Sequence, residues 1–297
     1  NSIFYVEKTI NINPEFIDAY INISLIYKKI NKLSLAKDWL EKGIKVDNKN
    51  YKIYFNLAAI YKTEDNFEEA IKFYQKTLQL NKNHYYSYYN LGNIYREVRE
   101  FEKAKYNYNQ ALEINNNFIS GYTNLLLTIA YSENNESYLK IAKDFSSFLP
   151  IYETKKIQFN SANEKEFKIG FVSPDFRNHP VGFFTKDLFN HLKKKNIKIY
   201  CYYNNSLNDD ITKSISSDSE KFFNIKKVND SEAINQIRND QLDLLVDLAG
   251  ISEGNRLTLF KNKCAPLQAT WCGWVATTGL NEIDYIFGDP YVTPFDD

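Results

Sequence analysis

Residues 54–61 read YFNLAAIY, and residues 88–95, which lie 34 positions later, read YYNLGNIY. The same register continues on both sides of these two stretches through the first half of the chain. Four tyrosines and four asparagines keep this spacing, which indicates an internal structural repeat. The residues in register are Tyr20, Tyr54, Tyr88 and Tyr122, together with Asn22, Asn56, Asn90 and Asn124.

Each repeat is predicted to contain two helices. Apolar residues between Tyr54 and Tyr61 follow the i, i+3, i+4, i+7 spacing of a helix with one buried stripe. Asn66 suits the N-cap of a second helix, and a small residue recurs late in each repeat, at Ala36, Ala70 and Ala104. This arrangement resembles the tetratricopeptide pattern. Full repeats are expected at about 17–50, 51–84 and 85–118, with a remnant before them and a degenerate repeat at about 119–149.

After Pro150 the pattern changes to short β-branched and aromatic runs that alternate with helical ones. Strands are predicted at 167–172, 197–203, 222–225 and 242–248, and helices at 183–194 and 231–239. Continuous apolar runs such as residues 244–246 favour a parallel sheet covered on both faces. The predicted organisation is an all-α tetratricopeptide superhelix over 1–149, a linker over 150–165 and a doubly wound, Rossmann-like α/β domain over 166–297.

The composition limits the class of protein. The 37 basic residues equal the 37 acidic ones, so no overall field draws in nucleic acid or an anionic membrane. The three cysteines lack a Cys-x-x-Cys spacing, which favours a reducing compartment and argues against a metal site. Without a membrane-length apolar stretch or a signal segment, a cytoplasmic location is predicted. Because the sequence contains no Met, we expect it to be an internal fragment with further repeats before Asn1.

Parallel sheets bind ligands at the carboxyl ends of their strands, and this marks three loops as candidates, at 173–182, 249–255 and 272–279. In the first, a neutral His179 at a helix N-terminus is placed to accept a proton from an attacking hydroxyl group. The alternative is that His179 only caps the helix. In the last, glycines flank Thr277 and Thr278 and offer hydrogen bonds to a sugar, although a purely structural turn explains the same residues.

Several motifs occur in a fixed order behind the repeats. The chain thereby resembles the tetratricopeptide-containing protein O-GlcNAc transferases and their bacterial SPINDLY-like relatives, over nearly its whole length. The motifs are GFVSPDFRNHP at 170–180, LVDLAG at 245–250, GNR at 254–256, APLQATW at 265–271, TTG at 277–279 and IDY at 283–285.

The resemblance implies the N-terminal half of a GT-B glycosyltransferase, with the nucleotide held mainly by a second half beyond Asp297, so that this fragment alone is inactive. It also implies that a sugar is transferred from a nucleotide sugar to Ser or Thr with inversion of configuration and without a metal or a cofactor. The expected donor is UDP-GlcNAc. Cys272, Val275 and Ile251 depart from the family pattern and leave the donor open, with GDP-fucose as the alternative. The residues implied in the site are His179 at the reaction centre and Gly273, Cys272, Val275, Thr277, Thr278 and Gly279 at the donor sugar.

The asparagine register has two interpretations. Asn22, Asn56, Asn90 and Asn124 fall on one wall of a stacked array, where a carboxamide can donate to and accept from an extended peptide backbone. Alternatively, each asparagine braces neighbouring helices. The resemblance favours binding of protein or peptide substrates along the concave repeat surface. A non-catalytic scaffold that only assembles partners through its repeats is the rival hypothesis.

Overall fold

The computed structural model describes residues 2–132, 135–152, 166–274 and 276–288, which form two compact units. The first unit spans Asn1–Glu133 and the second Asn134–Asp297. The helix α9 (Asn135–Phe148) therefore belongs to the second unit, whereas the sequence placed residues up to 149 with the repeats. Among the described residues, no helix is both long and apolar enough to cross a membrane.

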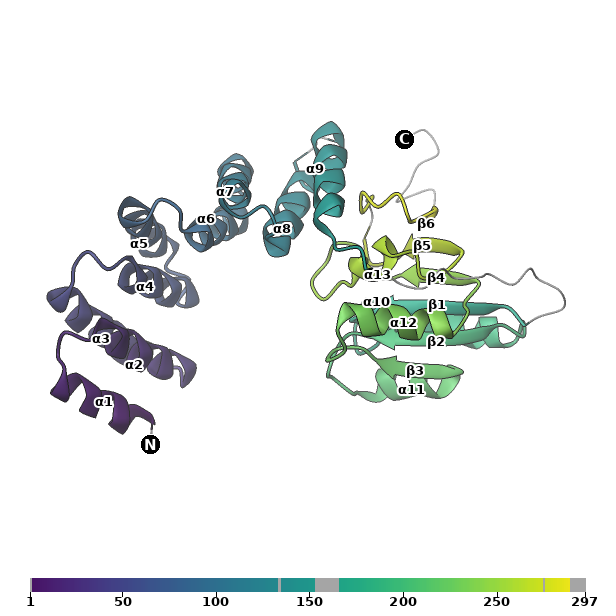
Figure 1. Cartoon of the computed structure of the whole chain (residues 1–297), viewed down its shortest axis with the longest axis horizontal. Coiled ribbons are helices and arrows are strands. Elements are labelled where there is room, and N and C mark those ends of the chain that lie inside the picture. The colour runs from purple at the N-terminus through teal and green to yellow at the C-terminus, as the bar shows by residue number, and fades with distance from the viewer. Residues whose placement is uncertain (1, 133–134, 153–165, 275, 289–297) are drawn as a thin grey trace. The chain divides into compact units, whose positions relative to one another are not determined.

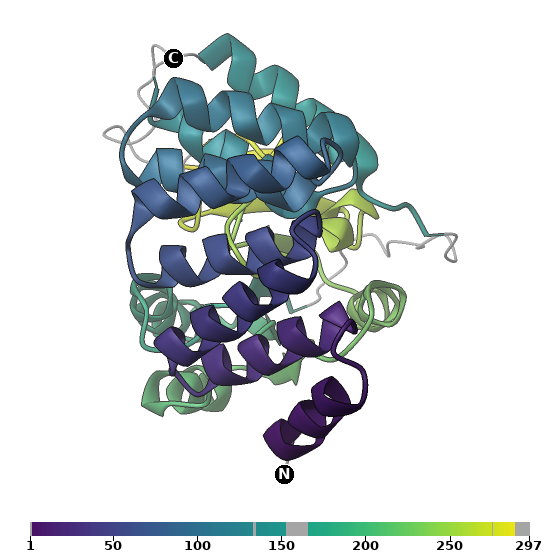
Figure 2. The same cartoon turned by 90° about the vertical axis from the view of Figure 1, so that its left-hand side faces the viewer.

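The first unit is a stack of antiparallel helix pairs (Figures 1 and 2). Three pairs coincide with the repeats expected at 17–50, 51–84 and 85–118, and one helix precedes and one follows them. The helices are α1 (Ser2–Ile12), α2 (Ile17–Lys29), α3 (Leu33–Val46), α4 (Tyr51–Thr63), α5 (Phe67–Leu80), α6 (Tyr85–Glu97), α7 (Phe101–Ile114) and α8 (Ile119–Ala130).

Local signals and packing explain these helices. The Asn66 side chain accepts a hydrogen bond of 3.3 Å from the backbone N–H of Glu69, so the predicted N-cap of α5 is present. Ala36, Ala70 and Ala104 are completely buried, because only a small side chain fits where the two helices of a repeat meet. Each repeat buries its apolar stripe against the next one, which is why the stack forms as a unit.

The second unit is built on a six-stranded sheet in the order β3-β2-β1-β4-β5-β6, with every pair parallel (Figure 1). This order reverses direction between the neighbours β1 and β4, as in a doubly wound Rossmann-like sheet. The predicted fold class is therefore confirmed. The strands are β1 (Lys168–Ser173), β2 (Lys198–Tyr203), β3 (Lys221–Asn224), β4 (Leu244–Asp247), β5 (Leu267–Trp271) and β6 (Tyr285–Phe287).

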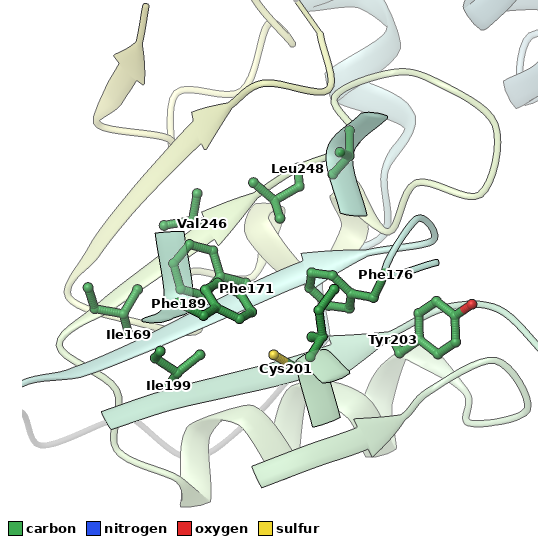
Figure 3. Packing of buried hydrophobic residues seen from close by; sticks show 11 residues of the cluster. Ile169, Phe171, Phe176, Phe189, Ile199, Cys201, Tyr203, Val246 and Leu248 are labelled. Atoms are coloured by element: carbon green, nitrogen blue, oxygen red, sulfur yellow. The ribbon is translucent and has the colours of Figure 1, made fainter. Parts of the chain in front are cut away.

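Four further helices accompany the sheet: α10 (Pro180–Lys193), α11 (Asp210–Asp218), α12 (Asp230–Asn239) and α13 (Leu257–Lys261). On one face, Phe171 of β1 packs against Phe189 of α10, with ring centroids 4.8 Å apart (Figure 3). On the opposite face, Gly170 leaves no room for a side chain, because an added Cβ would lie 2.3 Å from Leu242 Cδ1. The core thus fixes β1 and β4 beneath the loops that follow them.

Candidate functional site

A cavity of about 510 Å³ opens at the carboxyl edge of the sheet, beside the reversal between β1 and β4. Loops that follow five strands line it, and both His179 and Gly273 are among the lining residues. Two residues predicted for the site from distant parts of the sequence are therefore brought to one cavity. Its lining is Pro174, Asp175, Arg177, His179, Val181, Asn204, Asn205, Lys226, Leu248, Ser252, Glu253, Gly254 and Gly273.

The loop after β1 is held tightly over the start of α10. An added Cβ on Gly182 would lie 2.0 Å from the Arg177 carbonyl oxygen, so only glycine permits this loop to close. The backbone N–H of Asn178 donates a 2.6 Å hydrogen bond to Oδ2 of Asp209, which lies at the N-cap of α11. Hydrogen bonds from backbone N–H groups, that of Asn178 foremost, hold the pKa of Asp209 below its ordinary value.

His179 both caps α10 and lines the cavity. Its Nδ1 atom accepts a hydrogen bond of 3.3 Å from the backbone N–H of Val181, and its side chain is 37% exposed. A neutral imidazole that accepts at Nδ1 carries its proton on Nε2. The structure therefore shows the cap, and in this tautomer the other ring nitrogen is an N–H donor that can contact a bound group but cannot accept a proton.

The charges of the cavity are distributed unevenly. Arg177 is neutralised by Asp175, whose Oδ1 lies 2.8 Å from the guanidinium Nη2, and the same carboxylate lies 3.8 Å from His179 Nδ1 through Oδ2. Within the described part of the chain, neither Lys226 nor Glu253 has an ion-pair partner. A bound anion can therefore pair with Lys226 directly, whereas it would have to displace the Asp175 carboxylate to pair with Arg177.

Arg256 joins two of the loops that line the cavity, those after β3 and β4. Its side chain is 12% exposed and pairs with Asp230 at 2.7 Å. It also donates to the carbonyl oxygens of Ile225 at 2.8 Å and Val228 at 3.2 Å. One side chain therefore connects the segment after β3, the start of α12 and the segment after β4. The sequence marked the GNR motif at 254–256 without giving Arg256 this role.

Asp247 organises the turn after β4. It is almost completely buried and accepts hydrogen bonds from the backbone N–H groups of Ala249 (3.1 Å) and Gly250 (2.8 Å) and from the Thr270 hydroxyl group (3.0 Å). Burial raises the pKa of Asp247 to about 6, because the three hydrogen bonds compensate only part of the cost of removing the carboxylate from water. Its role is to shape the loop, and it does not line the cavity.

In the loop after β5, Gly273 lines the cavity and Cys272 packs against the core. Gly273 lies so close to the end of β4 that an added Cβ would be 1.8 Å from the Leu248 carbonyl oxygen. Cys272 adopts a φ of +67° and packs against the core of the sheet. Of this loop, only Gly273 lines the cavity, and Val275 lies outside the described residues.

Thr277, Thr278 and Gly279 contact α9 or their own turn and not the cavity. The Tyr138 hydroxyl group donates to the Thr277 carbonyl oxygen at 2.9 Å, and Thr278 is only 2% exposed. Gly279 has a φ of +74°, and an added Cβ would lie 2.2 Å from the Ala142 carbonyl oxygen. In this structure these three residues form a turn against α9, and their contact with a donor sugar stays a prediction.

Asn204 and Asn205 are lining residues that the sequence did not predict. Asn204 Nδ2 donates to the Gly254 carbonyl oxygen at 2.8 Å, and Asn205 Nδ2 donates to the Pro174 carbonyl oxygen at 3.0 Å. They tie the loop after β2 to the loops after β4 and β1. Their position directly after a predicted strand of a parallel sheet was the signal that could have found them.

In the repeat unit, the four asparagines in register differ in their contacts. Asn124 is fully engaged, since Nδ2 donates to Asn93 Oδ1 at 2.8 Å and to the Tyr89 hydroxyl group at 2.9 Å. Asn56 Nδ2 bonds within its own helix to the Lys52 carbonyl oxygen at 2.8 Å. Among the described residues, no partner is found for the carboxamides of Asn22 and Asn90. Bracing therefore describes Asn124, and the other three retain hydrogen-bonding capacity.

No cluster of three or more His, Cys, Asp or Glu side chains suited to a metal ion occurs in the part of the chain that the structure describes. The cysteines in that part are free thiols, two of them buried. The polar groups that line the cavity include the imidazole of His179, the ammonium group of Lys226 and the carboxylate of Glu253.

Comparisons with known proteins agree with this architecture. Residues 148–297 match the model of Glycosyl transferase family 41, and residues 17–50 and 51–117 match tetratricopeptide-repeat models. A solved O-GlcNAc transferase mutant from Thermobaculum terrenum aligns with a TM-score of 0.70 over 92% of this chain and 53% of that chain. At 23% identity this similarity shows the shared fold, repeats followed by a parallel α/β domain.

Two curated relatives are similar over the part of the chain that aligns with them. One, from Arabidopsis thaliana, is named "Probable UDP-N-acetylglucosamine--peptide N-acetylglucosaminyltransferase SEC" and is 30% identical over 131 residues. The other, "UDP-N-acetylglucosamine--peptide N-acetylglucosaminyltransferase" from Caenorhabditis elegans, is 28% identical over 140 residues. The alignments cover 44% and 46% of this chain and only 13% and 12% of the relatives' lengths.

Proposed function

The chain belongs to glycosyl transferase family 41, and on that basis we propose that it is part of a protein O-glycosyltransferase whose repeats hold the target protein. The observation that carries the proposal is that His179 and Gly273 line one cavity at the reversal of the sheet. Ligands of open α/β sheets bind at this position. The names of the relatives support UDP-GlcNAc as the donor and a peptide as the acceptor.

The proposed reaction is an inverting transfer that needs no metal. The oxygen of a Ser or Thr hydroxyl group forms a bond to the anomeric carbon of the sugar, while the bond from that carbon to the nucleotide diphosphate breaks. The diphosphate carries away the electron pair of the broken bond, and the hydroxyl proton passes to water or to an oxygen of the departing diphosphate. A site for this chemistry has to orient the sugar and stabilise the negative charge that develops on the leaving group.

His179 is proposed to act at the sugar through Nε2. With Nδ1 engaged by the Val181 N–H, the neutral ring presents Nε2–H as a donor, suited to an oxygen of the bound donor or acceptor. Acceptance of a proton at Nε2 would require the other tautomer and the loss of this cap. The cap therefore favours an orienting, hydrogen-bond-donating role for His179 over that of a general base.

The cavity supplies little positive charge for a diphosphate. Arg177 is already paired with Asp175, which leaves Lys226 as the available lysine. One exposed ammonium group is a weak counterpart for a leaving diphosphate. We therefore expect the 297 residues alone to bind a nucleotide sugar weakly and not to transfer it. The chain spans about half of the solved chain that it matches, and activity is proposed for the whole protein.

The proposal is tested with the protein produced from its full-length gene. It is incubated with UDP-GlcNAc and a Ser/Thr peptide, and mass spectrometry looks for the addition of one sugar. A parallel incubation with GDP-fucose separates the two donors that the departures at Cys272 and Ile251 leave open. Peptide binding without binding of either nucleotide sugar would instead support the non-catalytic scaffold.

A further inference from the structure

A second set of residues keeps the 34-residue register in the repeat unit. Lys28 near the end of α2, Lys62 near the end of α4 and Arg96 near the end of α6 are each 34 positions apart. The corresponding position of α8 is Ala130, so the series ends there. We call Lys28, Lys62 and Arg96 the cation series. Like charges in register along a stack repel one another, and an anionic ligand would relieve this repulsion.

The cation series meets the asparagines across neighbouring repeats. Arg96 Nη1 donates a hydrogen bond of 3.2 Å to Oδ1 of Asn124, from the first helix of one repeat to the first helix of the next. The 34-residue register gives Lys62 the same place relative to Asn90, and Lys28 the same place relative to Asn56. Cations and carboxamides therefore alternate along the wall formed by the first helices of the repeats.

The positive charge on this wall is only partly compensated. Lys62 lies 3.7 Å from Glu97, a pair in which both side chains are partly exposed. Lys28 is half-buried and has no anionic partner among the described residues. Burial lowers the pKa of Lys28, and the nearby charge of Lys62 lowers it further. A half-buried ammonium group beside a second cation gains most from a carboxylate supplied by a ligand.

The imbalance is specific to this wall. The four first helices carry five basic side chains and two acidic ones, whereas the second helices α3, α5 and α7 carry nearly equal numbers. The complete chain is electrically neutral. The basic residues of the first helices are Lys28, Lys29, Lys52, Lys62 and Arg96, and the acidic ones are Asp18 and Glu97.

We infer that the first-helix wall binds an extended, acidic segment of the target protein, an inference that rests on the proposed binding of targets by the repeats. Carboxylates of the segment pair with Lys28 and Lys62, while the carboxamides of Asn56 and Asn90 bond to its backbone. Arg96 is held by Asn124 and marks the end of the series. The asparagines bind the backbone of the target segment, so they contribute affinity that does not depend on its sequence. The cations favour segments that carry acidic side chains.

The test measures binding of three labelled peptides to the intact chain by fluorescence anisotropy. One peptide is rich in Asp and Glu, the second carries Asn and Gln at the same positions, and the third carries Lys. We expect the acidic peptide to bind about tenfold more tightly than its amide counterpart at low salt and to lose this advantage as salt screens the charges.

Two double variants locate the effect. Lys28→Gln with Lys62→Gln should bring the acidic peptide down to the affinity of the amide peptide. The matched control, Lys45→Gln with Lys76→Gln, removes two exposed lysines of the second helices that have no ion pair within the described residues, and should keep the preference. Thermal melting verifies that both variants fold.

The outcomes separate the two proposals. If acidic and amide peptides bind equally, or if the control variant loses as much as the Lys28/Lys62 variant, the acidic selectivity is wrong while binding of targets by the repeats survives. If none of the three peptides binds, both proposals fail. A preference for the acidic peptide that depends on Lys28 and Lys62 supports the inference.

Discussion

The Tyr138 hydroxyl group accepts a hydrogen bond of 2.7 Å from the indole N–H of Trp274, which joins α9 to the loop after β5. The same hydroxyl group donates to the Thr277 carbonyl oxygen at 2.9 Å. Burial raises the pKa of Tyr138 to about 12, so the group remains a neutral donor at physiological pH. A helix assigned by sequence to the repeats thus fixes the loop that carries Gly273.

Tyr138→Phe should lower the free energy of unfolding by about 1–3 kcal/mol, because it leaves the Trp274 N–H and the Thr277 carbonyl group without their partner. Chemical denaturation followed by tryptophan fluorescence measures the change. Tyr131→Phe serves as the control, since Tyr131 is 70% exposed. Equal stability of the two variants would show that α9 does not hold this loop.

Removal of the Arg256 side chain should disturb the loops after β3 and β4, which line the cavity. Arg256→Met deprives Asp230 of its partner and frees the carbonyl oxygens of Ile225 and Val228, at an expected cost of roughly 3 kcal/mol. The control Lys213→Met breaks the exposed pair with Asp210 and should cost less than about 1 kcal/mol. Denaturant titrations measure the free energy of unfolding of both variants. If Arg256→Met lowers it no more than Lys213→Met does, Arg256 does not hold these loops together.

Asp247 should make stability depend on pH in a defined direction. Its pKa is about 6 in the folded chain against an ordinary value of 3.8, so between these values the folded chain binds more protons than the unfolded one. The contribution of Asp247 to the free energy of unfolding is therefore fully present below about pH 4. It falls by roughly 3 kcal/mol as the pH rises through 6.

Asp247→Asn removes this titration while the other carboxylates remain, so the difference between wild type and variant isolates it. The variant is expected to be less stable at both ends of the range, because an amide cannot accept all three hydrogen bonds. The gap in unfolding free energy should shrink between pH 4 and pH 7. Parallel pH profiles would contradict the raised pKa.

The asparagines should divide into two classes. Asn56→Ala with Asn90→Ala should weaken peptide binding and change the melting temperature little, because neither side chain bridges two helices. Asn124→Ala should destabilise the repeat unit by about 1–3 kcal/mol, because it empties a network with Tyr89, Asn93 and Arg96. Melting curves measure the stability of both variants, and peptide titrations measure their affinity for peptide. A large stability loss in the Asn56/Asn90 variant would favour bracing throughout.

The sequence predicted most of the fold because the repeat reveals its own period and because β1, β2 and β4 are continuous apolar runs. It missed β5, where Gln268 interrupts the apolar pattern. The structure shows that this side chain is buried with its amide nitrogen bonded to the Phe260 and Glu282 carbonyl oxygens. It also missed α13, which has five residues and therefore no helical period to detect.

The cavity was only partly predictable. His179 could be placed because it follows a predicted strand of a parallel sheet, and Gly273 because the resemblance to a known family implies it. Asn204 and Asn205 were not predicted, because their loop contains neither the Gly nor the Pro that is typical of a ligand-binding loop. The contacts of Thr277 and Gly279 with α9 could not be predicted, because no local pattern reveals packing against a helix more than 130 positions earlier. Their contact with the donor sugar stays a prediction.

The central claim is that His179 serves sugar transfer at the cavity. The most direct measurement is the rate of sugar addition to a Ser/Thr peptide by the full-length protein, compared with His179→Ala and with His191→Ala, an exposed histidine of the same helix. The account predicts a loss of at least about a hundredfold for His179→Ala and an unchanged rate for His191→Ala, with both variants folded. Full transfer by folded His179→Ala would contradict it.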